Sequence, residues 1–191
     1  MLGSDTPVRS TAQARARLRD IIADKSQLAG TFKLASGGTS GFFFDMKPTL
    51  MDPEGANLVA ELILDLLKDE KVEFVGGLEL GAVPLATIVA QKSHYTGRPV
   101  PAFLVRKEPK SRGTEKVIEG NIRKGAEVVV LEDVTTKGNS ALKAVDAVRA
   151  EGCIVRRIVT VVDRLDGAAE NLKAHGLALS SLFTKDDFQA K

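Results

Sequence analysis

The stretch VVVLEDVTTKGNS, from Val128 to Ser140, decides how this chain folds. It opens as a continuous apolar segment, and we expect a buried strand over Glu127–Leu131. Two carboxylates follow, then a short polar loop, and then a predicted helix over Ser140–Glu151. A strand that is apolar on both faces and leads into a helix is typical of a parallel sheet covered by helices on both sides.

The polar loop in this stretch suits a phosphate monoester. Backbone N–H groups at the start of a helix can converge on an anion, and Gly138 lets the backbone approach it closely. Further donors are the hydroxyls of Thr135, Thr136 and Ser140. Glu132 and Asp133 can accept hydrogen bonds from a sugar diol, directly or through the waters of a metal ion. A ligand with a diol at one end and a phosphate at the other is a ribose 5-phosphate.

A purely structural interpretation of the same residues stays open. Acid pairs are common at strand ends, and Ser, Thr and Gly turns often only cap helices. The ATP-binding loop of the GxxxxGK[ST] type does not match, because Lys137 and Gly138 stand in the reverse order.

Predicted strands and helices alternate on both sides of this stretch. We expect strands at Phe74–Gly76, Val100–Val105, Ile154–Val162 and Leu177–Phe183. We expect helices at Val8–Asp24, Asp52–Leu67, Pro84–Gln91 and Gly167–His175. Thr31–Asp45 is predicted to form a strand pair with its turn at Ser36-Gly37-Gly38. The pattern predicts an α/β fold in a single domain over residues 1–191.

The composition excludes several classes of protein. The net charge of +2 is too small to indicate a nucleic-acid or membrane partner, and no apolar stretch is long enough to span a bilayer. Cys153 is the only cysteine, and Met1–Ser10 has no apolar run of the kind that secretion signals carry, so we expect a cytoplasmic protein. His94 and His175 have no metal-ligand spacing, which argues against a dedicated zinc site.

A cationic segment follows the predicted strand Val100–Val105. Arg106–Lys116 has almost no apolar residue, so it cannot belong to a core, and Gly113 gives it a hinge. We expect a long exposed loop whose cations are Arg106, Lys107, Lys110, Arg112 and Lys116. The alternative is a solvated surface without a ligand.

Together these features resemble type I phosphoribosyltransferases, and among them the orotate phosphoribosyltransferases. Val128–Ser140 resembles their phosphoribosyl-pyrophosphate signature. Phe32–Ser40 with Phe43-Phe44-Asp45 looks like the N-terminal hood on the orotate side. Arg106–Gly113, closing with Ile118-Glu119-Gly120, is similar to the flexible catalytic loop, and Asp163-Arg164 stands where the family places an orotate-contacting arginine.

The resemblance, which covers roughly Phe32–Arg164, implies the architecture of the family. This is a type I phosphoribosyltransferase fold: a central, mostly parallel sheet with helices on both faces, a small hood over about residues 1–50 and a flexible loop over residues 106–118. It also implies a homodimer with shared active sites, in which the loop reaches into the neighbour's site. Mg²⁺ would be held mainly through substrate and water, near Glu132 and Asp133.

The implied reaction joins orotate to phosphoribosyl pyrophosphate and releases pyrophosphate and orotidine 5′-monophosphate. By this resemblance the catalytic residues are Lys107, Lys110, Arg112 and Asp133. The phosphoribosyl-pyrophosphate site comprises Arg106, Lys107, Lys110, Arg112, Glu132, Asp133, Val134, Thr135, Thr136, Lys137, Gly138, Asn139, Ser140, Leu80 and Gly81. The orotate site comprises Thr136, Arg164, Phe43, Phe44 and Ala35. For the two phenylalanines, plain core packing is an equal alternative.

The sequence departs from the family pattern at three positions, and two other functions remain possible. Arg112 stands where the family's loop often has histidine, and Ala35 and Gly81 stand where some members have lysine. One alternative is a purine-base phosphoribosyltransferase. The other is a regulatory protein of the same fold that senses phosphoribosyl pyrophosphate. Residues 1–31 are too short for the added DNA-binding domain of such regulators, so we expect no nucleic-acid partner.

Overall fold

The computed structural model describes residues 10–33, 39–108 and 116–189. Its centre is a six-stranded sheet in the order β5-β4-β3-β6-β7-β8. All neighbouring pairs are parallel except β4 and β5, which pair antiparallel. The strands are β3 (Phe74–Leu78), β4 (Ala102–Val105), β5 (Ile118–Glu119), β6 (Glu127–Thr135), β7 (Ile154–Asp163) and β8 (Ala178–Thr184).

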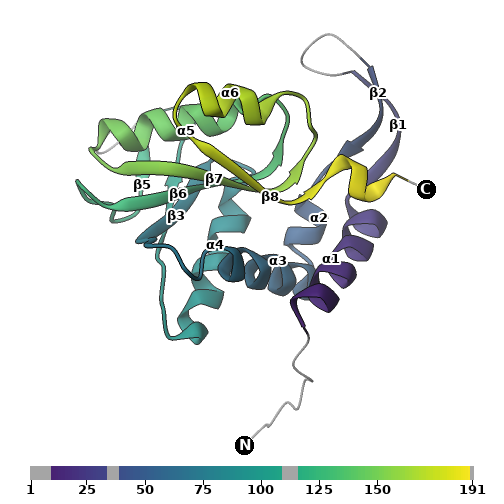
Figure 1. Cartoon of the computed structure of the whole chain (residues 1–191), viewed down its shortest axis with the longest axis horizontal. Helices are drawn as coiled ribbons and strands as arrows, with labels where there is room; N and C mark the ends of the chain where they lie inside the picture. Colours follow the sequence, from purple (N-terminus) through teal and green to yellow (C-terminus); the bar gives the residue numbers. More distant parts are fainter. Residues whose placement is uncertain (1–9, 34–38, 109–115, 190–191) are drawn as a thin grey trace, which may run out of the picture.

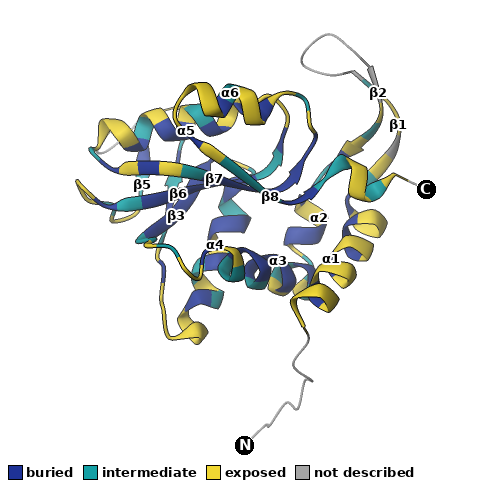
Figure 2. Ribbon diagram, viewed as in Figure 1, coloured by how far each residue is buried: buried dark blue, intermediate teal, exposed yellow. Residues whose placement is uncertain are grey.

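Helices cover both faces of this sheet (Figure 1). One face packs against α1 (Thr11–Lys25), α3 (Pro53–Leu66) and α4 (Ala82–Ser93), and the other against α5 (Asn139–Ala150) and α6 (Ala168–Ala174). Neighbouring strand residues alternate between the two cores: Val129 and Leu131 belong to the first, and Val128 and Val130 to the second. The sheet is the most deeply buried layer (Figure 2). The predicted α/β fold is confirmed.

Local sequence signals fix where the helices begin. Ser10 forms a capping box with Gln13, so α1 begins at Thr11 rather than at the predicted Val8. The Asp52 carboxylate accepts hydrogen bonds from the N–H groups of Glu54 (3.1 Å) and Gly55 (2.9 Å) at the start of α3. Both caps satisfy N–H groups that a helix leaves without partners in its first turn.

A small second layer stands at the carboxyl end of the sheet. β1 (Gln27–Lys33) and β2 (Thr39–Phe44) pair antiparallel apart from the main sheet, which confirms the predicted strand pair; its predicted turn lies outside the described residues. A short helix, α2 (Lys47–Leu50), follows β2. Phe44 packs on Phe188 of the 3₁₀ helix η2 (Lys185–Phe188), with ring centroids 5.1 Å apart. The sequence did not predict α2, η2, β5 or the 3₁₀ helix η1 (His94–Thr96).

Several strand bounds differ from the prediction by one or more residues, and two of these differences affect the site. β6 continues to Thr135 instead of ending at Leu131, because Val134 and Thr135 extend the ladder with β7. The carboxylates of Glu132 and Asp133 therefore stand on the strand and not in the loop after it. β3 likewise runs to Leu78, and α4 begins at Ala82, ahead of the predicted Pro84.

The order of the strands creates a switch point beside β3. The chain leaves β3 toward β4 on one side and later returns to place β6 on the other side. The helices that follow β3 and β6, α4 and α5, lie on opposite faces of the sheet (Figure 1). A crevice opens at the carboxyl ends of two strands in this arrangement, and ligands of open α/β sheets bind there.

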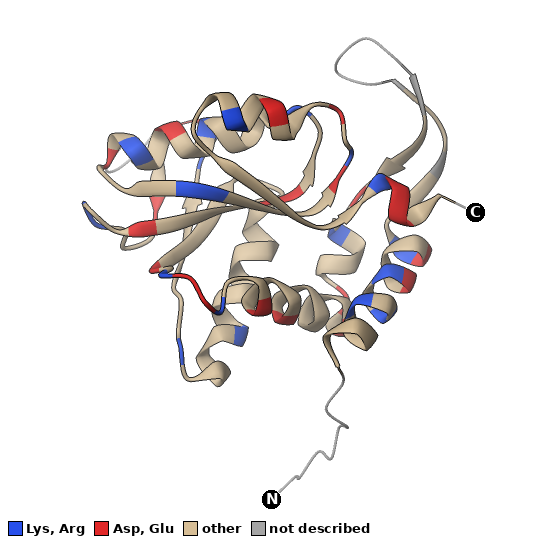
Figure 3. Ribbon diagram, in the orientation of Figure 1, with Lys and Arg blue, Asp and Glu red and all other residues tan. Residues whose placement is uncertain are grey.

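Among the described residues no helix is both long and apolar enough to cross a bilayer. The exposed side of α1 carries Arg15, Arg17 and Arg19, followed by Asp20, Asp24 and Lys25, so both signs of charge appear on this helix (Figure 3).

Candidate active site

Two segments that are far apart in sequence meet at the carboxyl end of the sheet: the β3–α4 loop and the end of β6. The β3–α4 loop approaches the end of β6 so closely that a Cβ added to Gly81 would lie 2.5 Å from an oxygen of Asp133. Leu80 is 60% exposed beside it, and the peptide bond between Glu79 and Leu80 is cis. Gly81 and Asp133, both predicted site residues, therefore lie against each other at the carboxyl ends of β3 and β6.

Buried polar groups without partners gather at this edge of the sheet. Among the described residues, such side-chain atoms are found in only four residues: Arg106, Glu132, Thr135 and Arg164. Arg106 follows β4 directly, Glu132 and Thr135 end β6, and Arg164 follows β7. An unsatisfied buried polar group costs about 1–3 kcal/mol, so a cluster of them indicates the place where a polar ligand completes the hydrogen bonds.

The pKa values of the two carboxylates at the end of β6 are raised above their ordinary values. Glu132 is 8% exposed, and burial, with a smaller effect of the neighbouring Asp133 charge, raises its pKa to about 8. Burial also raises the pKa of Asp133, although its Oδ1 accepts a hydrogen bond from the N–H of Val134 at 2.8 Å. In the ligand-free protein Glu132 is therefore largely protonated at neutral pH.

The loop after β6 offers backbone donors at the start of α5. Gly138 stands before the helix with φ of 77°, a conformation that glycine adopts without strain, and no side chain caps the first turn. Asn171 of α6 holds the loop from behind, because its Nδ2 donates to the carbonyl of Lys137 at 2.7 Å. Thr136, Lys137, Asn139 and Ser140 are exposed, Val134 is half-buried and Thr135 is buried. The first turn of α5 is therefore open to an anion.

Arg164 sits beside this loop as a buried cation. Only 4% of the residue is exposed. Its backbone N–H donates to the carbonyl of Thr135 at 2.9 Å, and its guanidinium lies 3.7 Å from the carboxylate of Asp166. Its guanidinium lies 5.6 Å from the centre of the Phe42 ring. A buried guanidinium with one long ion pair is well prepared to bind an anionic ligand.

The hood phenylalanines divide between the two faces of β2. Phe42 and Phe44 share one face with ring centroids 5.6 Å apart, and Phe44 is 3% exposed within the core. Phe43 is on the other face, 41% exposed, beside Phe32. The structure thus brings Phe42, which the sequence analysis missed, to Arg164. Phe43 and Phe44 as orotate contacts stay a prediction.

The structure fixes the base of the cationic loop. The N–H of Lys107 donates to the Glu79 carboxylate at 2.9 Å, and Arg106 lies 3.7 Å from Glu119 of β5. Glu79, which sequence reasoning also missed, thereby ties this loop to the β3–α4 loop. Of the predicted site residues, Lys110, Arg112 and Ala35 lie outside the described residues.

The carboxylates fit a magnesium ion that substrate and water would share. No group of three or more His, Cys, Asp or Glu residues in the described part of the chain could hold a metal by itself. Glu132 and Asp133 supply oxygen ligands of the kind Mg²⁺ prefers, and one Glu132 oxygen lacks a partner. Mg²⁺ usually keeps several waters and binds one or two carboxylates together with substrate phosphates, which matches this donor set.

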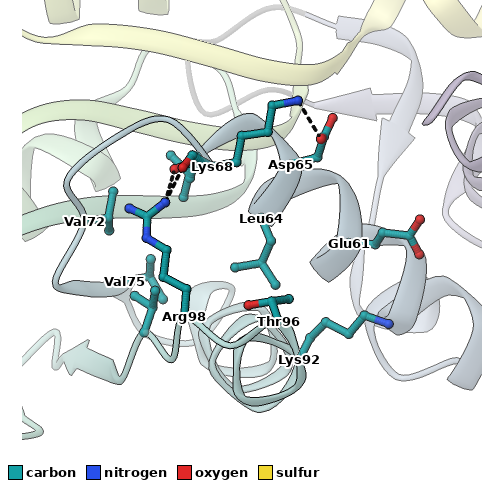
Figure 4. Close-up of a pocket in the computed structure, with 11 residues that line it drawn as sticks. Glu61, Leu64, Asp65, Lys68, Val72, Val75, Lys92, Thr96 and Arg98 are labelled. Atoms are coloured by element: carbon teal, nitrogen blue, oxygen red, sulfur yellow. Dashed lines mark hydrogen bonds and ion pairs between the residues drawn. The ribbon is translucent and has the colours of Figure 1, made fainter. Parts of the chain in front are cut away.

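A largely apolar cavity lies near the amino end of β3, away from this group of residues, and Figure 4 shows the side chains that line it. It measures about 300 Å³ between α3, α4 and the start of β3, with Leu64, Val72 and Val75 in its lining. Several charged groups in its lining already have partners: Lys68 contacts Asp65 at 3.2 Å, and Arg98 donates to backbone carbonyls just after α3. The candidate chemistry is therefore at the carboxyl end of the sheet.

Comparison with known proteins gives a consistent result. Residues 49–176 match the family model described as "Phosphoribosyl transferase domain". An orotate phosphoribosyltransferase of Bradyrhizobium sp. is 49% identical over 183 residues, covering 94% of this chain and 99% of that protein.

Solved structures agree with this result. A Mycobacterium tuberculosis orotate phosphoribosyltransferase in complex with Fe(III) dicitrate aligns with a TM-score of 0.82 and 38% identity, covering 93% of this chain and 99% of that one. The same organism's enzyme in complex with 5-phospho-alpha-D-ribosyl 1-diphosphate aligns with a TM-score of 0.77 and 37% identity, covering 92% and 98%.

Proposed function

Because this chain belongs to the orotate phosphoribosyltransferase family, we propose that it transfers the 5-phosphoribosyl group of phosphoribosyl pyrophosphate to orotate. The products are orotidine 5′-monophosphate and pyrophosphate, a step of pyrimidine synthesis. The observation that carries this proposal is the cluster of buried side-chain atoms without a hydrogen-bond partner in Arg106, Glu132, Thr135 and Arg164, at the carboxyl ends of β4, β6 and β7.

The end of β6 and the loop after it hold the sugar phosphate. The hydroxyls of the ribose donate to Glu132 and Asp133, and this favours the ionised carboxylates over the protonated form that burial favours in the free protein. The phosphate accepts hydrogen bonds from the open first turn of α5 and from the hydroxyls of Thr136 and Ser140. The acidic and phosphate-binding parts thus orient the two ends of one ligand.

The pyrophosphate leaves from the opposite side of the sugar, next to the β3–α4 loop. The bond between the anomeric carbon and a pyrophosphate oxygen breaks while a bond to orotate forms, so positive charge develops on the sugar ring and negative charge on the leaving group. Glu132 and Asp133 would hold Mg²⁺ together with water and substrate, and the ion would supply positive charge that offsets the negative charge of the leaving group. The backbone around Leu80 and Gly81 and the cations Arg106, Lys107, Lys110 and Arg112 stabilise the same negative charge.

Arg164 selects the base. Orotate carries a carboxylate, and a guanidinium can bind a carboxylate through two parallel hydrogen bonds. The backbone N–H of Arg164 donates to the carbonyl of Thr135 at the end of β6. The base-binding residue is therefore next to the residues that hold the sugar. Phe42, packed on the guanidinium, holds it in place, and a neutral purine leaves this buried cation unpaired.

Release of pyrophosphate with each base tests the assignment. Turnover with orotate, and none with hypoxanthine, adenine or uracil, is the expected result. Turnover with a purine alone would establish the purine-base alternative. Binding of phosphoribosyl pyrophosphate without turnover of any base would favour the regulatory protein.

The chain acts as a cytoplasmic homodimer with shared sites, in which residues 106–118 of one subunit complete the site of the other. The family supports this, and it has a direct test in the variants Lys110→Ala and Asp133→Asn. Each variant alone is inactive, but a mixed dimer pairs an intact loop with an intact Asp133. Recovery of activity on mixing is expected, whereas inactive mixtures would show that each loop serves its own subunit.

A further inference from the structure

Asn171 of α6 bonds to the back of the phosphate loop, by which we mean residues 136–138 between β6 and α5. Its Nδ2 donates to the carbonyl oxygen of Lys137 at 2.7 Å and lies 3.5 Å from Oδ1 of Asn139. Asn171 and Lys137 are 34 residues apart in sequence, and the sequence analysis gave Asn171 no role. The contact therefore joins the phosphate loop to a helix that carries no predicted site residue.

The backbone that carries Asn171 is firmly held against the phosphate loop. The Asn171 N–H donates to the carbonyl of Gly167 at 3.2 Å, and its carbonyl bonds to Nδ1 of His175 at 2.8 Å. The next residue, Leu172, is fully buried, and a Cβ added to Gly138 would lie 3.1 Å from its Cγ. The amide of Asn171 is therefore presented to the loop from a fixed position.

The hydrogen bond from Asn171 to Lys137 fixes the direction of the next backbone N–H. The peptide bond between Lys137 and Gly138 is trans, so its C=O and its N–H point to opposite sides of the chain. Since the carbonyl points toward Asn171, the Gly138 N–H points away from α6. A ligand approaches the loop from the side that α6 does not cover, so this N–H is a donor available to a phosphate.

Without that hydrogen bond the peptide between Lys137 and Gly138 has a second accessible orientation. Gly138 has φ of 77°, and turning the peptide over brings φ to negative values, which glycine adopts about as readily. The turned peptide directs the Lys137 carbonyl to solvent and the Gly138 N–H toward Leu172. A carbonyl oxygen that faces a phosphate repels it, so only the orientation seen here binds the ligand.

We propose that Asn171 is a positioning residue for the phosphate monoester of the sugar donor, because it holds the Lys137 carbonyl and so keeps the Gly138 N–H directed at the phosphate. The inference rests on the proposed function, since that function supplies the phosphate monoester. Asn171 acts through the loop and does not touch the ligand. Its loss lowers the fraction of protein whose loop can bind phosphate, and the apparent Kd rises in inverse proportion to that fraction.

Binding of ribose 5-phosphate, measured by calorimetry, tests the proposal without turnover. Asn171→Leu keeps a similar branched shape and cannot donate, so we expect binding about 5-fold weaker, which corresponds to one hydrogen bond of about 1 kcal/mol. Asn57→Leu is the matched control: Asn57 lies on α3, on the other face of the sheet, where its Oδ1 accepts from Nζ of Lys92 at 2.8 Å, and binding should be unchanged. Equal affinity of Asn171→Leu and the wild type would overturn the proposal.

The amide proton of Gly138 reports on the positioned group itself. In heteronuclear NMR spectra of the wild type, saturation with ribose 5-phosphate should move this resonance downfield, because the N–H then donates to a charged oxygen. A Gly138 resonance that does not respond to ribose 5-phosphate in the wild type would contradict the proposal.

Kinetics separate positioning of the phosphate from a general structural role. For Asn171→Leu the KM for phosphoribosyl pyrophosphate should rise about 5-fold while kcat and the KM for orotate stay unchanged, because this phosphate is bound equally in the ground and transition states. An equal rise in both KM values, or a fall in kcat alone, would overturn the proposal. If Asn171→Leu does not fold, Asn171→Ala takes its place with the same expected results, because alanine is the residue best suited to a helix.

The result is separable from the fate of the proposed function. If the wild type binds ribose 5-phosphate but turns over no orotate, the function fails while the Asn171 comparison still gives its answer. If the wild type turns over orotate and Asn171→Leu binds ribose 5-phosphate equally well, the Asn171 proposal alone fails.

Discussion

Replacement of Glu132 by glutamine should stabilise the ligand-free protein, and by an amount that grows with pH. The carboxyl group is 8% exposed with one oxygen unpaired, and burial raises its pKa to about 8 from an ordinary value of 4.5. The folded protein therefore holds the proton more tightly than the unfolded chain does. Glutamine has nearly the same shape and never ionises.

The sign and size of the effect follow from proton linkage. Between pH 4.5 and pH 8 the folded state binds more protons at this group, so the wild type loses stability as the pH rises through that range. Below pH 4.5 the loss is absent, and above pH 8 it is complete. At about 1.36 kcal/mol per pH unit the full span is worth on the order of 5 kcal/mol, and two units within it about 3 kcal/mol.

Urea unfolding of the two proteins at pH 5.5 and pH 7.5, without metal or substrate, measures this difference. The advantage of Glu132→Gln over the wild type should be larger at the higher pH by about 3 kcal/mol. Glu170→Gln, at an exposed position of α6, controls for the substitution itself. An advantage that is the same at both pH values would refute the claim that Glu132 is held protonated by burial.

Three further substitutions test other parts of the site. Arg164→Lys keeps the charge but loses the planar fork, so the KM for orotate should rise about 10-fold or more with little change in the KM for phosphoribosyl pyrophosphate; equal rises would contradict a base-binding role. Gly81→Ala places a methyl group 2.5 Å from a carboxylate oxygen of Asp133, and we expect a loss of stability of about 1–3 kcal/mol together with weaker pyrophosphate binding, measured by thermal unfolding and calorimetry. Lys110→Ala should lower kcat far more than affinity for the sugar donor, and an equal loss in both would mean that the lysine binds only the ground state.

Local sequence signals determined the elements of the fold. The apolar run before Glu132 required a strand buried on both faces, and the Asp52-Pro53 pair required a helix start. Gly138 required the sharp turn between β6 and α5. These features depend on neighbouring residues, so periodicity and capping rules identify them without a partner from elsewhere in the chain.

Periodicity and capping rules could not predict other features of the structure, because those features depend on contacts between distant segments of the chain. β6 extends to Thr135 because β7 continues beside it. The mostly polar residues after Leu131 do not by themselves predict that strand pairing. The role of Phe42 follows from its side of β2 and from the position of Arg164, which comes more than a hundred residues later. The contact of Glu79 with Lys107 likewise became visible only once the chain had brought the β3–α4 loop beside the end of β4.

The sequence by itself thus predicted which residues bind a phosphorylated ribose, because the strand, acid pair, glycine turn and helix start lie within Val128–Ser140. The tertiary structure decided what surrounds that ligand. Strand order places β3 beside β6 and brings Gly81 against Asp133, while the hood places Phe42 beside Arg164. Burial then keeps Glu132 protonated in the free protein, an effect of the whole environment that no short segment encodes.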